Sequence, residues 1–144
     1  MILDNQNLFS DDQAITATAA STNVIDLGPT GTVPRSPSAL TRDISKGTDI
    51  PLLVQVTEAF NNLTSLAVAV QTDSDSAFGS ATTLYTQTVV LADLTAGKRI
   101  ALKTLPYGLT KRYVRLNYTV TGTAPTTGKV TAGITAGNDE TLPL

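Results

Sequence analysis

Short clusters of apolar residues alternate with polar residues along most of this chain. A period of two puts successive side chains on opposite faces of a β-strand, so that one face can be buried and the other hydrated. Thr is abundant, and Gly, Pro, Asn and Asp separate the clusters at short intervals, as is typical of strands joined by turns. The pattern predicts strands at residues 13–19, 23–27, 50–58, 65–72, 83–91, 99–104, 112–121 and 129–135.

The clearest alternation lies in residues 112–121, where Val114, Leu116, Tyr118 and Val120 share one face. This is the pattern of a half-buried antiparallel strand. Helical periodicity is nearly absent, and the only expected helical turn covers residues 91–97, ending at a Gly suited to a helix C-terminus.

About eight strands without repeats or intervening helices predict an all-β fold: a single-domain antiparallel β-sandwich, with jelly-roll connectivity favoured over other Greek-key arrangements. An immunoglobulin-like sandwich has a similar strand count, but this chain has no Cys and no Trp, which form the usual core of that family. A domain of 144 residues can bury roughly 70% of the surface that its unfolded chain exposes, which is enough for a real core.

Two segments fall outside the expected sheets. Residues 28–49 contain Pro29, Pro34 and Pro37 and few apolar residues, which predicts a long ordered loop. Loops of this length more often have a functional role than none. Residues 1–11 are expected to form an N-terminal arm with apolar anchors, followed by the sandwich at residues 12–144.

The composition argues against catalysis. Without Cys or His the chain lacks thiolate nucleophiles, the usual zinc ligands and the commonest general base, so we expect no enzyme activity and no cofactor. The acidic segment at residues 73–79 has Phe78 where a calcium-binding EF-hand loop requires Gly, which favours a simple turn over a metal site. No apolar run approaches the ~20 residues of a membrane span, and no secretion signal is evident, so neither membrane association nor export is expected.

The charges are unevenly distributed. Residues 94–138 contain seven Lys or Arg and no acid, whereas the first 93 residues contain ten acids and three bases. Such asymmetry suggests a charged face for docking onto another protein or another copy of the chain. The basic residues near Tyr107 and Tyr113 could also be interpreted as a nucleic-acid surface, but the chain as a whole is acidic, and a protein contact is the preferred interpretation.

Sequence segments along nearly the whole chain resemble the small cement, or decoration, proteins of tailed-bacteriophage capsids built from HK97-like major capsid proteins. These segments are residues 2–19, 21–28, 68–78, 94–102, 105–106, 112–122 and 127–133.

The resemblance implies a jelly-roll protein on the outer capsid surface of the virion, made in the host cytoplasm, that clamps neighbouring major capsid proteins and stabilises the shell. It also implies self-association, as a homodimer or a trimer, and no catalytic residues. The candidate contact residues with the capsid or another partner are Ile2, Leu3, Leu8, Phe9, Arg35, Arg42, Lys98, Arg99, Lys111 and Arg112. The alternative function is a virion adhesive module that binds host surface glycans through exposed tyrosines: Tyr85, Tyr107, Tyr113 or Tyr118.

Overall fold

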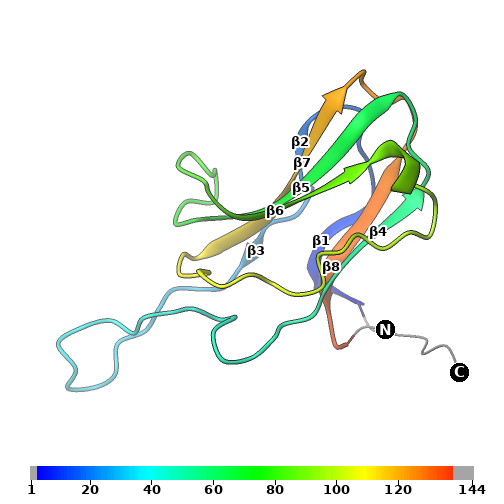
Figure 1. The fold of residues 1–144 in the computed structure, drawn as a ribbon. Coiled ribbons are helices and arrows are strands. Elements are labelled where there is room, and N and C mark those ends of the chain that lie inside the picture. The colour runs from blue at the N-terminus through cyan, green and yellow to red at the C-terminus, as the bar shows by residue number, and fades with distance from the viewer. Residues whose placement is uncertain (1–2, 138–144) are drawn as a thin grey trace, which may run out of the picture.

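The computed structural model describes residues 3–137, which form two antiparallel sheets packed face to face (Figure 1). The smaller sheet has the order β1-β8-β4. In the larger sheet β7, β5 and β6 lie in that order, and two short strands, β2 and β3, both pair with the free side of β7. The strands are β1 (Leu3–Ala14), β2 (Ala19–Ala20), β3 (Ile25–Asp26), β4 (Leu52–Glu58), β5 (Leu63–Asp73), β6 (Thr82–Val90), β7 (Tyr113–Gly122) and β8 (Lys129–Thr135). One 3-10 turn, η1 (Leu91–Asp93), follows β6.

The inward faces of the two sheets form the core. In β7 the predicted alternation is confirmed, because Val114, Leu116 and Tyr118 are buried, whereas the residues between them retain exposure. The other core side chains come from β1, β4, β5 and β8 and from the turn after β1, and they include Phe9, Ile15, Val54, Val56, Leu66, Val68, Val70, Val130 and Ala132. The prediction of an all-β fold with antiparallel sheets is therefore confirmed, while jelly-roll connectivity stays a prediction.

A buried polar contact links the two sheets inside this core. The hydroxyls of Ser10 in β1 and Tyr118 in β7 lie 2.8 Å apart, and Ser10 also donates to the Gln13 side chain at 2.7 Å. Gln13 in turn donates to the Ala20 carbonyl at 2.9 Å, which ties β1 to β2. Burial raises the pKa of Tyr118, an effect that the Ser10 contact opposes only in part, so the phenol stays protonated at neutral pH.

The first predicted strand is misplaced. Residues 13–19 do not form one continuous strand, because β1 ends at Ala14 and the chain turns before β2 begins at Ala19. Ile15 occupies this turn, fully buried, and its amide donates to the Gly128 carbonyl at 3.0 Å. The alternating residues that predicted a strand here instead include a turn between β1 and β2, at a corner of the sandwich.

The predicted N-terminal arm is also wrong for the described residues. β1 runs from Leu3 and pairs antiparallel with β8, with several register shifts along its length. Phe9 is completely buried between the sheets, and Leu8 is 9% exposed. Neither side chain can serve as an anchor for another protein while it packs in the chain's own core; Met1 and Ile2 lie outside the described residues.

Residues 97–105 form an irregular strip along β4 in place of the predicted strand 99–104. Backbone bonds join Ile100 to Val54 at 2.8 Å and Leu52 to Lys103 at 2.8 Å, but the strip folds back between these bonds, where the Leu102 amide donates to the Ile100 carbonyl at 2.7 Å. The strip therefore covers the outer edge of β4. The predicted helical turn at 91–97 appears as η1, and Gly97 has a φ of 85°.

Replacement of Phe9 by Ala distinguishes a core strand from an arm. We expect Phe9→Ala to lower the free energy of unfolding by about 3–5 kcal/mol, because it leaves a cavity between the sheets. Asn5→Ala, at an exposed position of the same strand, is the matched control and should leave stability within about 0.5 kcal/mol. Urea unfolding followed by circular dichroism measures both; equal stability of the two variants would contradict the placement of β1.

Candidate functional site

The most prominent surface feature is a loop that projects away from both sheets between β3 and β4 (Figure 1). Every residue from 29 to 41 is exposed. We call residues 29–41 the finger. It lies inside the long loop predicted at residues 28–49, so the sequence located this feature correctly.

The finger is an ordered hairpin. Thr32 and Ala39 form an isolated antiparallel bridge, and the Leu40 amide donates to the Gly31 carbonyl at 2.9 Å. At the tip the Ser36 amide donates to the Val33 carbonyl at 2.9 Å, which closes a four-residue turn. Three prolines within the finger, Pro29, Pro34 and Pro37, restrict its backbone further, so little entropy remains to be lost when the finger binds a partner.

Arg35 occupies a strained position at this tip. Its φ is 70°, whereas Pro34 before it has a φ fixed near −65° by its ring, and this combination is that of a type II turn. The third position of a type II turn normally carries Gly, because a side chain is disfavoured at positive φ. A residue held in such a conformation on an exposed tip is a reason to look for a function of its side chain.

Two large apolar side chains accompany Arg35 on the finger. Val33 is 48% exposed and Leu40 is 53% exposed. The finger therefore offers apolar surface and a cation together, on a segment with its own backbone hydrogen bonds. Arg35 could be predicted as a contact residue from the sequence, but the two apolar residues could not, because isolated Val and Leu in a Pro-rich loop give no periodic signal.

The finger is anchored where it leaves the larger sheet. Asp26 at the end of β3 accepts two hydrogen bonds from the Arg112 guanidinium, at 2.7 and 2.6 Å, and a third from the Gly28 amide at 2.8 Å. The hydrogen bonds from Arg112 and then Gly28 lower the pKa of Asp26 to about 2, with a further contribution from the positive charge of Arg42. The carboxylate therefore stays ionised, and the anchor intact, down to strongly acidic pH.

A second anchor holds the returning strand of the finger. The Asp43 carboxylate accepts the Gly108 amide at 3.1 and 3.2 Å, and the buried Ser45 hydroxyl donates to the Pro106 carbonyl at 2.5 Å. Both stems are thus fixed to the segment that leads into β7. Neither contact could be predicted from a local pattern, because each joins residues more than sixty positions apart.

The other predicted contact residues are dispersed. Leu3 is half-buried in β1, Arg42 is half-buried at the finger stem, and Arg112 binds Asp26 within the chain. Lys98 lies 3.4 Å from Asp93, and Lys111 donates to Thr82 at 2.9 Å. Of the ten residues, only Arg35 lies in the finger itself.

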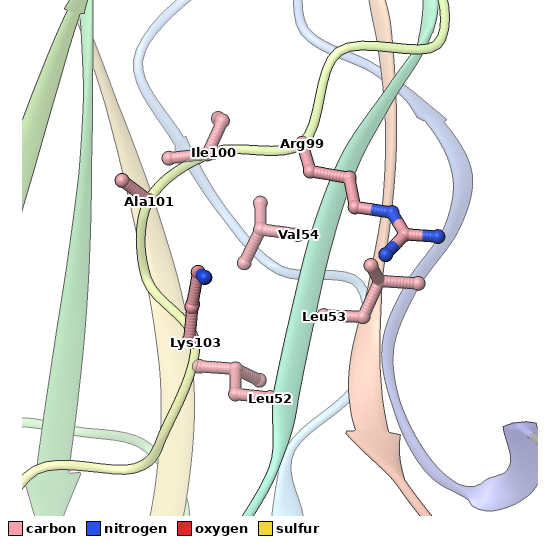
Figure 2. Close-up of a pocket in the computed structure, with 7 residues that line it drawn as sticks. All are labelled: Leu52, Leu53, Val54, Arg99, Ile100, Ala101 and Lys103. Atoms are coloured by element: carbon pink, nitrogen blue, oxygen red, sulfur yellow. The ribbon is translucent and has the colours of Figure 1, made fainter. Parts of the chain in front are cut away.

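Arg99 and Lys103 line a small hollow between β4 and the strip at residues 97–105. Its volume is about 140 Å³. Figure 2 shows that β4 supplies aliphatic side chains to it, whereas the strip supplies both basic residues, and the set is Leu52, Leu53, Val54, Arg99, Ile100, Ala101 and Lys103. The hollow is too small to bury a drug-sized ligand.

The acidic turn at residues 73–80 has a structural role. The Asp73 carboxylate accepts backbone amides from Ser74 at 2.6 Å, Asp75 at 3.3 Å and Ser80 at 2.8 Å. Burial by itself would raise the pKa of Asp73, but these amides lower it, so the carboxylate is ionised. The predicted turn is therefore confirmed. No group of three or more potential metal ligands occurs within residues 3–137.

The four tyrosines proposed for glycan binding differ in their exposure to solvent. Tyr118 is fully buried, which rules it out in this fold, whereas Tyr85 and Tyr107 are 44% and 67% exposed. Tyr113 is half-buried, with the Arg112 guanidinium 5.0 Å from its ring centre. Within the part of the chain that the structure describes, there is also no helix of the length and hydrophobicity that crossing a bilayer demands.

The Arg112–Asp26 anchor can be tested by titration. In Arg112→Ala the pKa of Asp26 should rise from about 2 toward 3.8, without reaching it, because the Gly28 amide still donates to the carboxylate. Any stability that this pair contributes is present above pH 3.8 and is lost as the pH falls through 2 in the native protein. NMR of the Asp26 carboxyl carbon measures the shift. Lys111→Ala, which removes a neighbouring cation that contacts Thr82 instead, should leave the pKa unchanged.

Comparison with known proteins gives one family. Residues 9–134 match the family described as Bbp16, a name associated with phages. No curated protein matches the chain. Because the match extends over most of the sequence and all of the strands from β2 to β7, the chain belongs to the Bbp16 family.

Proposed function

We propose that this chain is a structural cement protein that binds the outer surface of a phage capsid, clamps neighbouring major capsid proteins and has no catalytic role. The observation that carries the proposal is the finger: an exposed hairpin, fixed at both stems, that presents Val33, Arg35 and Leu40. The phage-associated family name and the resemblance to cement proteins support the choice of the capsid as the partner.

The finger suits attachment to a pre-formed surface. Burial of Val33 and Leu40 would supply apolar contact, and the Arg35 guanidinium would pair with a carboxylate at the rim of the same site. A hairpin held by its own hydrogen bonds and by two stem anchors loses little conformational freedom on binding, so more of the contact energy appears as affinity.

Clamping requires more than one attachment point. If two copies of the chain are joined, each bound finger raises the local concentration of the other near the shell, so that modest single contacts give firm overall attachment. We therefore place the protein on the virion as a homo-oligomer whose copies bind different major capsid subunits and resist their separation.

The test is co-sedimentation of the purified chain with undecorated shells assembled from the major capsid protein of the same phage. The native chain should sediment with the shells in a fixed ratio and raise their rupture temperature. The double variant Val33→Ser/Leu40→Ser should bind at least about tenfold more weakly, because each buried aliphatic side chain contributes about 1.5–3 kcal/mol.

Arg35→Gly is the sharper variant. Gly relieves the strained turn, so folding and the hairpin are preserved while the cation is lost; we expect weaker, less salt-sensitive binding. Val24→Ser is the matched control, since Val24 is 39% exposed but lies outside the finger. Native binding by all finger variants would refute the proposal. Retention of the chain on a glycan array, with no shell binding, would favour the adhesive alternative.

A further inference from the structure

One buried leucine lies on the outer face of the smaller sheet. Leu52 and Val54 of β4 point into the core, so Leu53 between them faces away from it. Leu53 is nevertheless only 3% exposed, and it is not part of the core cluster. A sheet face without a second layer over it is normally hydrated. The burial of Leu53 thus indicates that this face carries a cover of its own.

Further apolar surface adjoins Leu53. Its partner in β8 is Gly133, which has no side chain to cover the sheet. A Cβ at Gly133 would lie 3.3 Å from the half-buried Leu3 side chain, so Leu3 lies on this face too. Figure 2 shows the Arg99 side chain on the same side of β4 as Leu53. We call Leu3, Leu53 and Gly133 the outer patch. A chain segment that covers this patch needs apolar side chains and, beside Arg99, a negative charge.

The chain leaves the smaller sheet close to the outer patch. β8 ends at Thr135, whose amide donates to the Pro51 carbonyl at 3.1 Å, just before β4 begins. Ala136 and Gly137 then form a bend, and the φ of Gly137 is 139°, a conformation that L side chains rarely adopt. Beyond the described residues the sequence continues with Asn-Asp-Glu-Thr-Leu-Pro-Leu, residues 138–144, which we call the distal segment. An extended chain of this length reaches about 25 Å, whereas neighbouring strands lie about 4.8 Å apart.

The charges of the smaller sheet distinguish two directions for the distal segment. Toward β1 it would meet Asp4, which lines a hollow of about 290 Å³ at the end of β8, and like charges would repel each other there. Toward β4 it would meet Arg99 and Lys103, which line the hollow of about 140 Å³ described above. Because Asp139 and Glu140 are the only charged residues of the distal segment, its charge is complementary to the β4 side.

The chain lengths are compatible with contact between these charges. Arg99 forms an isolated bridge with Gln55, which lies three residues beyond the start of β4, or about 10 Å along the strand. Asp139 and Glu140 come four and five residues after Thr135, so an extended chain carries them about 13–18 Å from the end of β8. The acids therefore reach the level of Arg99 without any movement of the sandwich.

We infer that the distal segment folds back over the outer face of the smaller sheet, where its acids pair with Arg99 and Lys103 and its leucines cover the outer patch. In an extended chain Leu142 and Leu144 project to the same side, so both can face the sheet. Pro143 between them has no amide that would need a partner. The tether to β8 gives this occupant a high effective concentration, which favours it over a segment of another molecule. The inference does not depend on capsid binding.

A single Trp measures whether the distal segment is docked. The chain has no Trp, so Leu142→Trp places one indole in this segment and keeps an apolar side chain there. The neutral quencher acrylamide should quench this indole at least about tenfold less than in a synthetic peptide of residues 138–144 with the same substitution, because burial of one large apolar side chain favours the docked form by about that factor. The measurement uses the full chain.

Charge reversal tests the pairing. In the chain with the Trp, Arg99→Glu/Lys103→Glu should expose the indole to acrylamide. Adding Asp139→Lys/Glu140→Lys to that variant should protect the indole again, a recovery that a misfolded chain would not show. Lys111→Glu is the matched control, because Lys111 contacts β6 in the larger sheet, and it should leave the protection unchanged.

Dilution of the chain with the Trp separates the possible occupants. Protection within one chain does not depend on protein concentration, which is the expected result. Protection that is lost on dilution would assign the outer patch to a segment of a second copy, and protection that arises only when undecorated shells are added would assign it to the capsid. Either result would overturn the inference, as would equal quenching of the chain and the peptide. None of these results would alter the shell-binding test of the finger, so the two proposals fail separately.

Discussion

Backbone groups at the margins of a β-sheet must find partners, and this requirement governs most of the structure. β1 shields one margin with bulges and carboxylates, residues 97–105 cover β4, and the larger sheet tapers into the short strands β2 and β3. β6, the outermost strand on the other side of the larger sheet, contains nine residues without a charge, and one register shift interrupts its pairing with β5. Register shifts, charges, coverage and short length each discourage the addition of a foreign strand at a sheet edge.

The finger follows a different rule, because its backbone groups are exposed to water and its order comes from local bonds and from its stems. Asp26 and Asp43 fix the two stems through contacts with Arg112 and Gly108, both close to the start of β7. The same short segment thus orients the entire projection. Its tip can vary in sequence without disturbing the sandwich, provided that the two carboxylates remain.

The sequence predicted the strands that obey simple alternation and missed the features that depend on long-range pairing. Residues 129–135 and 112–121 were placed within one residue of β8 and β7, because their side chains alternate between core and solvent. The arm was misassigned because the partner of β1 lies more than a hundred positions away, and no local pattern shows that Phe9 meets the opposite sheet. The loop holding the finger could be predicted from its prolines; the stem anchors could not, since Asp26 and Arg112 are 86 positions apart.

The hydroxyl contact between Ser10 and Tyr118 has a consequence for how the two layers are aligned. Aliphatic side chains tolerate small sliding of one layer over the other, whereas two buried oxygens 2.8 Å apart are satisfied in a single alignment. Any displacement would take this partner away from the buried Tyr118 hydroxyl in an apolar interior. This pair therefore fixes the position of one layer against the other, and it helps a protein with few charges inside and no covalent cross-links to keep one unique arrangement of its layers.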